Sequence, residues 1–178
     1  MDSEIKRKIQ DNPSDIVFPE DVLSEYAKDL LEVTESKVKA VVNAYNGAVE
    51  SYTYNPFAIA ISNALGKTEY NVQNDLGQIG DTYNSKFEFL ILSDFLPDFK
   101  YRLLFAKCNI GGYPCSIIME QGFAELINEK LERDGYIYTV SNSEELSALL
   151  DLVFTSDKFI TLIKQIIAVI YRQNRIEE

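Results

Sequence analysis

Two short motifs place a carboxylate two residues before a lysine: Glu35 precedes Lys37, and Asp98 precedes Lys100. Metal-dependent nucleases of one kind pair acids with a lysine, and Mg²⁺ needs only one or two protein carboxylates because water completes its coordination shell. The further acids that could join the second motif are Glu88 and Asp94. The sequence therefore allows a divalent-metal-dependent hydrolase of the nuclease kind.

Both motifs also have an ordinary explanation. Glu35 and Lys37 stand at the entrance of an expected strand, where solvated charges are usual, and Asp98 stands in a Leu-Pro-Asp turn, where Asp bonds its own backbone. An acidic chain also suits a nucleic-acid substrate poorly. The hydrolase is therefore the alternative hypothesis, and no catalytic residue, metal ligand or cofactor is assigned.

Cys108 and Cys115 are the only cysteines, and they flank Gly111-Gly112. A two-residue hairpin loop at these glycines places the cysteines opposite each other. The full register pairs Ile110 with Tyr113, Asn109 with Pro114 and Cys108 with Cys115. Such a pair is either a redox-switchable cross-strand disulfide or two small buried hydrophobic residues that stay reduced in the cytosol. We favour the reduced pair, because two cysteines make no disulfide framework.

The chain contains no histidine. This excludes Ser-His-Asp and Cys-His triads and zinc sites that include His, and two cysteines are too few for an all-cysteine zinc site. The sequence Gly77-Gln78-Ile79-Gly80 lacks the spacing and the Lys-Ser/Thr of a phosphate-binding loop. The absences leave carboxylate–metal chemistry as the remaining enzymatic route.

Residues 67–86 form the longest polar, turn-prone stretch of the chain. Loops of this length in a compact domain are uncommon and are often functional. We therefore predict that a partner contacts this stretch. The candidate contact residues are Asn71, Asn74, Asp75, Gln78, Asp81 and Tyr83.

The net charge is −11, from 28 acidic and 17 basic residues. An acidic surface repels phosphate backbones and attracts basic proteins, so the expected partner is another protein and not a nucleic acid. The N-terminus lacks the apolar region of a secretory signal, and the longest apolar stretch is shorter than a bilayer requires. We expect a cytoplasmic protein that does not enter membranes.

The first half of the chain predicts a helix and a hairpin. Pro19 suits the first turn of a helix whose apolar residues recur every three or four positions as far as Thr34. Its acids fall mostly on the opposite face. Residues 37–45 and 48–54 read as two strands joined by Asn46-Gly47, and 57–65 as a helix. Tyr45, Tyr52 and Tyr54 could form a binding surface, although aromatic residues are also simply common on strands.

The second half predicts a sheet and three helices. Apolar runs at 87–92, 101–106 and 114–119 indicate an antiparallel meander covered on both faces, and 136–140 a further short strand. Helices are expected over 123–131, after a cap at Ser141 (paired with Glu144), Asn142 or Ser143, and after Ser156. The apolar stripe of the last helix is Phe159, Ile160, Ile163, Ile166, Ile167 and Ile170.

These elements predict one α+β domain over residues 1–178: an antiparallel meander and hairpin sheet with N-terminal and C-terminal helices packed against it. Residues 1–14 would form a flexible arm and 172–178 a frayed tail. The expected function is a non-catalytic protein-interaction module. Its size, acidity and lack of motifs are typical of small bacterial or phage accessory proteins such as immunity proteins or inhibitors. The last helix is apolar on more than one face, so it is either central to the monomer or a homo-oligomer contact.

Overall fold

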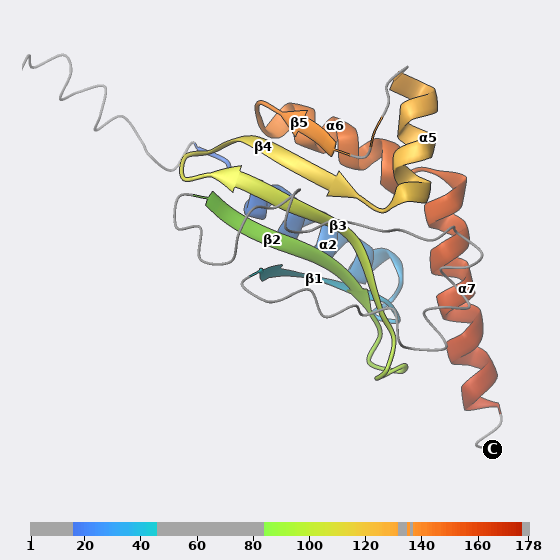
Figure 1. Ribbon diagram of the computed structural model, residues 1–178. Helices are drawn as coiled ribbons and strands as arrows, with labels where there is room; N and C mark the ends of the chain where they lie inside the picture. The colour runs from blue at the N-terminus through green and yellow to red at the C-terminus, as the bar shows by residue number, and fades with distance from the viewer. Residues whose placement is uncertain (1–15, 46–83, 132–134, 136, 176–178) are drawn as a thin grey trace, which may run out of the picture.

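The computed structural model describes residues 16–45, 84–131, 135 and 137–175 (Figure 1). The predicted strand 48–54, helix 57–65 and most of the polar stretch 67–86 lie outside these residues. The six candidate partner-contact residues, from Asn71 to Tyr83, also lie outside them.

The centre of the fold is a five-stranded antiparallel sheet in the order β1-β2-β3-β4-β5. The strands are β1 (Lys39–Ala44), β2 (Asn84–Leu92), β3 (Lys100–Asn109), β4 (Gly112–Met119) and β5 (Ile137–Val140). The predicted meander is confirmed. β2 begins at Asn84, so residues 84–86 are strand and not loop as predicted, because Lys86 pairs with Lys107 and Ser85 with Cys108.

Four helices accompany the sheet in the described part of the chain: α2 (Pro19–Val33), α5 (Gln121–Leu131), α6 (Ser143–Phe154) and α7 (Asp157–Asn174). α2 packs on β1 and β4 and lies beside α6, which contacts β5. In Figure 1, α2 crosses behind the sheet and α7 stands at one end of it. The α+β class, with helices from both ends of the chain, is confirmed.

The core lies between the sheet and the helices. Strand alternation turns every second residue toward α2 and α6, and these residues belong to one buried cluster with the apolar stripe of α2. The sheet contributes Phe89, Leu104, Ala106, Ile117, Met119 and Tyr138. The opposite face of the sheet carries Leu90, Phe105 and Ile118, which are also buried. Both faces are therefore apolar at the centre, as the low polarity of the strands predicted.

Side-chain caps fix where α6 and α7 begin. Asn142 caps α6, since its Oδ1 accepts a hydrogen bond from the backbone N–H of Glu145 at 2.8 Å. The predicted Ser141–Glu144 box is wrong: the carboxylate that reaches back to the Ser141 N–H, at 2.8 Å, belongs to Glu145. Ser156 caps α7 through the N–H of Phe159 at 3.2 Å, as predicted.

The stripe predicted for α7 needs one correction. Leu162 is fully buried although it lay off the predicted stripe, whereas Ile160 is 40% exposed. The buried face is set by the core cluster that α7 shares with α6 and the sheet, and it lies slightly around the helix from the isoleucine run. One face of α7 is thus buried in the core of the monomer, and the use of this helix in a homo-oligomer stays a prediction.

Candidate interaction surface

The hairpin of β3 and β4 differs from the predicted hairpin at its tip. Cys108 faces Cys115 as predicted, but Asn109 pairs with Gly112, so the turn is Ile110-Gly111 and not Gly111-Gly112. Tyr113 and Pro114 then have no partner on β3 and form a bulge, where the missing N–H of proline costs no ladder bond. Gly112 has φ +88°, a conformation that glycine adopts without steric cost and that ends the turn.

Cys108 and Cys115 form a disulfide across this hairpin. Their Cα atoms are 4.1 Å apart, close to the short spacing of a non-hydrogen-bonded antiparallel pair. Both residues are buried in the core cluster. The favoured interpretation of a reduced pair is therefore wrong for this structure, because the register brings the two side chains face to face on the same side of the sheet.

The N-terminal end of α2 rests on the hairpin tip. A Cβ atom added to Gly112 would lie 3.0 Å from Cδ1 of Phe18, so the strand passes directly beneath the phenyl ring. Ile16, Val17 and Phe18 are all exposed, and Ile110 at the turn is 84% exposed. These four residues are called the tip patch below. Four large apolar side chains exposed together at one end of a molecule are unusual outside contact sites.

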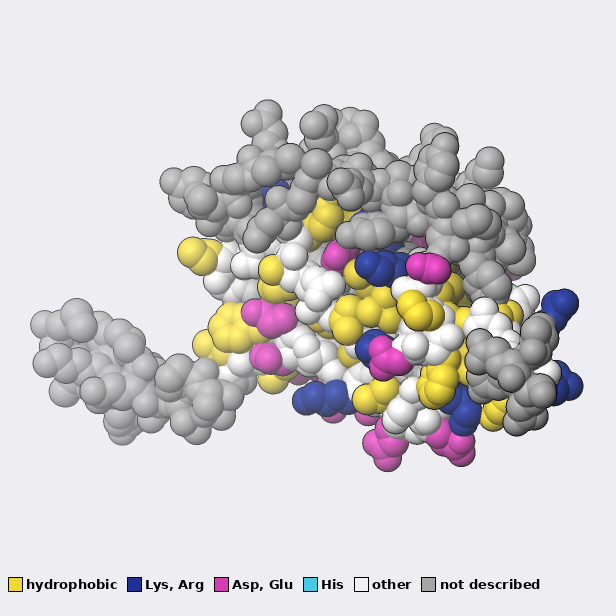
Figure 2. All heavy atoms as spheres, turned by 90° about the horizontal axis from the view of Figure 1, so that it is seen from below, with side chains coloured by type: hydrophobic (Ala, Val, Ile, Leu, Met, Phe, Trp, Pro, Cys, Tyr) yellow, Lys and Arg dark blue, Asp and Glu magenta, His cyan; other side chains and the backbone are white. Residues whose placement is uncertain are grey.

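Carboxylates lie beside the tip patch: the Phe18 N–H, for example, donates to Oδ2 of Asp21 at 3.1 Å. Tyr113, the residue after Gly112, lies near the first turns of α2 and α6. Burial, together with the charges of Glu144, Glu20 and Asp21, raises the pKa of its hydroxyl to about 12. Its Oη is buried and has no hydrogen-bond partner among the described residues. Figure 2 shows, toward the left of the view, hydrophobic side chains with acidic ones beside them.

The acidic surface continues along the two helices. α2 and α6 lie side by side, joined by the Tyr26 hydroxyl, which donates to the Ser147 carbonyl at 3.0 Å and the Asp151 carboxylate at 2.5 Å. Their outer sides carry eight carboxylates, and Lys28 is the single basic residue of the two helices. We call this surface the acidic layer: Glu20, Asp21, Glu25, Asp29, Glu32, Glu144, Glu145 and Asp151. The predicted outward position of the α2 acids is confirmed.

Three of the four acids considered for a hydrolase, namely Glu35, Asp94 and Glu88, form ion pairs with lysine or arginine. Glu35 pairs with Lys37 at 2.5 Å, and Asp94 pairs with Lys39. These pairs lie at the same end of the sheet, because the Ser93 hydroxyl donates to the Lys37 carbonyl at 2.7 Å. The structure therefore brings the first motif, Glu35 and Lys37, to the same end of the sheet as Asp94. Each of these two acids is engaged in an ion pair. Within the described residues, no group of three or more potential ligands gathers in a metal-binding arrangement.

Glu88 lies elsewhere, on the face of the sheet opposite α2. Its Oε2 accepts from Nε of Arg102 at 3.1 Å, and both side chains are nearly buried. The Arg102 guanidinium stacks on Phe105, 4.3 Å from the ring centroid, and Tyr45 packs edge-on against the same ring. Of the three tyrosines considered as a binding surface, Tyr45 is part of this packed cluster, and Tyr52 and Tyr54 lie outside the described residues.

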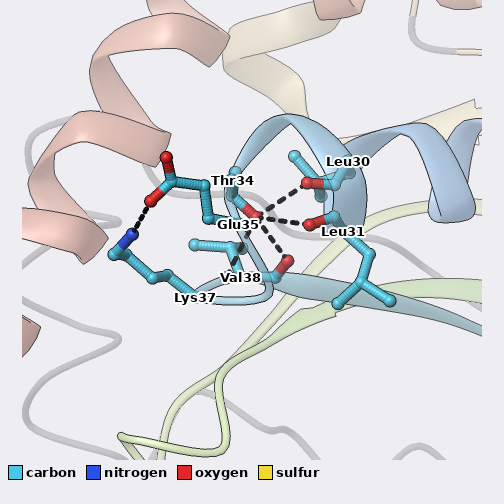
Figure 3. A network of polar contacts seen from close by, with 6 residues as sticks. All are labelled: Leu30, Leu31, Thr34, Glu35, Lys37 and Val38. Atoms are coloured by element: carbon cyan, nitrogen blue, oxygen red, sulfur yellow. Dashed lines mark hydrogen bonds and ion pairs between the residues drawn. The ribbon is translucent and has the colours of Figure 1, made fainter.

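The turn after α2 is held in an uncommon conformation (Figure 3). Glu35 and Ser36 have φ values of 51° and 62°, in the left-handed region. The Ser36 N–H donates to the Leu31 carbonyl at 2.8 Å, and the Glu35 N–H donates to the Glu32 carbonyl at 3.0 Å. These two bonds end the helix as a Schellman motif. The Thr34 hydroxyl donates toward Leu30 and Val38 and accepts from the Val38 N–H at 3.2 Å. Backbone hydrogen bonding therefore explains the turn.

Glu120, like Thr34, is a buried polar residue that holds elements of the fold together. Glu120 is buried where β4 meets α5, and its Oε2 accepts from the N–H of Phe123 at 3.2 Å, so it caps α5. Burial, with the Glu120 charge nearby, raises the pKa of Tyr101 on β3. Burial lowers the pKa of Lys158 on α7, and Glu120 partly opposes that shift. The cluster brings β3, α5 and α7 together around one carboxylate.

Sequence reasoning missed the tip patch, although two signals for it were present. Ile16-Val17-Phe18 is a run of three apolar residues directly before a helix, and Ile110 is a large apolar residue in a glycine turn. Exposed apolar runs of this length usually have a function.

No described helix has the length and apolarity needed to cross a membrane. No family model, curated protein or solved structure shows significant similarity to this chain.

Proposed function

We propose that this protein is a non-catalytic protein-interaction module of the cytoplasm, and that it binds its partner through the tip patch and the adjoining acidic layer. The observation that carries the proposal is the exposure of Ile16, Val17, Phe18 and Ile110 beside Glu20, Asp21 and Glu144. The proposal extends the expectation of a protein partner, which came from the net charge, because it names the surface that binds.

The composition of this surface defines the partner. Apolar side chains surrounded by charge are typical of protein interfaces, in which the apolar centre supplies most of the affinity and the charged rim sets orientation and association rate. Carboxylates on the rim select lysine and arginine. The partner is thus a protein with an apolar contact flanked by basic residues, and a nucleic acid is disfavoured by the same charges.

The same arrangement favours binding over hydrolysis. Glu35, Asp94 and Glu88, all considered as metal ligands, each form an ion pair with a lysine or arginine. A metal site would have to displace those cations. The tip patch, in contrast, presents apolar side chains that no described residue covers enough to bury.

Two matched variants test the proposal. Ile110 is 84% exposed at the tip, and Val33 is 82% exposed at the other end of α2. Ile110→Ser should abolish capture of a partner from lysate of the native host, and Val33→Ser should leave it unchanged. Each variant removes one exposed apolar side chain, but only Ile110 belongs to the tip patch. Equal capture by both variants would place the contact elsewhere.

A purified probe tests the charge of the partner. An amphipathic peptide of leucine and lysine should bind, its leucine–glutamate counterpart should not, and added salt should slow the association. Glu144→Lys should weaken binding of the basic peptide. Glu129→Lys, on α5 and outside the acidic layer, is the control. Equal binding of both peptides would contradict the proposed charge selectivity.

A further inference from the structure

The disulfide lies at the base of the hairpin tip. Cys108 and Cys115 form the last cross-strand pair before the bulge, and beyond them only Asn109 pairs with Gly112. Gly112 in turn lies under Phe18, a member of the tip patch. The covalent bond therefore stands between the regular sheet and the part of the hairpin that helps form the proposed contact surface.

We propose that the Cys108–Cys115 disulfide is a redox switch that orders the tip patch when oxidised and releases it when reduced. The inference rests on the proposed function, because it assigns a regulation to the same surface. It also fits the proposed compartment: disulfides in the cytoplasm are rare, and those that occur are usually transient and redox-sensing.

The chemistry of the switch is thiol–disulfide exchange. A thiolate of a dithiol reductant attacks one sulfur of the pair, the sulfur–sulfur bond breaks, and a mixed disulfide forms. The second thiol of the reductant then releases the protein. Cys108 and Cys115 gain two electrons and two protons, and the reductant leaves as its own disulfide.

The position of the pair explains why exchange is conditional. Both cysteines are buried, so a reductant reaches the sulfurs only when the hairpin end opens locally. Beyond the disulfide the tip is held by one ladder pair, by the contact of Gly112 with Phe18 and by a half-buried Tyr113 whose hydroxyl has no partner among the described residues. After reduction, these contacts alone hold the tip.

The first experiment uses the wild-type protein in two redox states. The folded protein is treated with dithiothreitol or with a disulfide oxidant, free thiols are alkylated, and the adducts are counted by mass spectrometry. Hydrogen exchange then compares residues 109–113 with the centre of α7. We expect two alkylated thiols after reduction and at least about tenfold faster exchange at the tip, equivalent to about 1.4 kcal/mol, with α7 unchanged. Alkylation that requires global unfolding, or identical exchange in both states, would overturn the switch.

The second experiment separates the switch from the proposed function. The leucine–lysine peptide should bind the oxidised protein about tenfold more tightly than the reduced protein. Equal binding in both states sinks the switch and leaves the proposed function standing. Absence of binding in both states sinks the proposed function, whereas redox-dependent exchange at the tip still supports the switch.

A variant without the bond provides the control. The double substitution Cys108→Ala and Cys115→Ala should bind the peptide as weakly as the reduced wild type, in oxidant and in reductant alike. If it binds like the oxidised protein, the bond does not order the tip. Gln121→Ala, an exposed substitution on α5, should keep the redox response of the wild type.

Discussion

Gly112 and Phe18 are in direct contact across 94 positions of sequence: a Cβ atom at residue 112 would lie 3.0 Å from Cδ1 of Phe18 and 3.1 Å from Cδ of Pro19. The contact joins the start of α2 to the β3–β4 hairpin. It exists because residue 112 has no side chain.

Gly112→Ala should therefore destabilise the protein and displace Phe18. The left-handed φ of +88° costs a non-glycine residue about 1–2 kcal/mol, and the crowded Cβ adds to this. Urea unfolding should show a loss of about 2 kcal/mol. Gly111→Ala is the matched control, since nothing lies within 4 Å of its Cβ position, and it should be close to neutral. Similar losses for both variants would show that the Phe18 contact is unimportant.

The Glu88–Arg102 pair should be costly to break and cheap to replace. Glu88→Ala leaves a nearly buried guanidinium without its carboxylate, and such uncompensated charges cost about 3–5 kcal/mol. Replacing both residues, by Glu88→Leu with Arg102→Met, removes the charge as well and should cost less than the single change. Glu88→Leu and Arg102→Met are also measured singly. If the loss of stability in the double variant equals the sum of these two single losses, the residues are not coupled. Asp94→Ala, at an exposed pair, should cost less than about 1 kcal/mol.

Tyr113 should make stability fall in strong base. Its folded pKa of about 12 is above the ordinary value of 10.0, so the folded state keeps the proton while the unfolded chain loses it. The corresponding stability is complete below the ordinary value and is lost as the pH rises through the folded pKa. The stability of Tyr113→Phe, measured by its urea midpoint, should thus fall less steeply with pH across this window than that of the wild type.

The carboxylates around Tyr113 provide a second readout of the same shift. Glu144→Gln should lower the pKa of Tyr113, because Glu144 has the largest effect among the three carboxylates that oppose ionisation of Tyr113. Tyrosinate absorbance, taken as the difference from Tyr113→Phe, measures it. Glu25→Gln, on the same acidic layer but not among those charges, should leave the titration as in the wild type.

Glu35→Gly should stabilise the protein. Residue 35 has φ 51° after the last turn of α2, where glycine avoids a steric cost of about 1 kcal/mol. The lost ion pair with Lys37 is exposed and contributes less than that. We expect a net gain in stability by denaturant unfolding, and a larger gain in a Lys37→Ala background. Loss of stability in that background would mean that the Glu35 side chain has another role.

Within the described residues, the sequence by itself determined the elements and their order. Apolar residues three or four positions apart predicted α2, and alternating or continuous apolar runs predicted the strands, because both periods are local properties of the backbone. The glycine turn also placed Cys108 opposite Cys115, although the turn itself is one residue earlier. The acids of α2 were correctly placed away from the core because they alternate with its stripe.

Only the tertiary structure decided which of these residues act together. The contact of Phe18 with Gly112 and the hydrogen bond from Tyr26 to Asp151, 125 positions apart, join segments whose local patterns carry no information about each other. The same holds for the burial of Leu162 in place of Ile160, which depends on how α7 packs into the core cluster that it shares with α6 and the sheet. Local periodicity fixes which way a side chain points from its own helix or strand, whereas the packing of distant elements decides what it meets there.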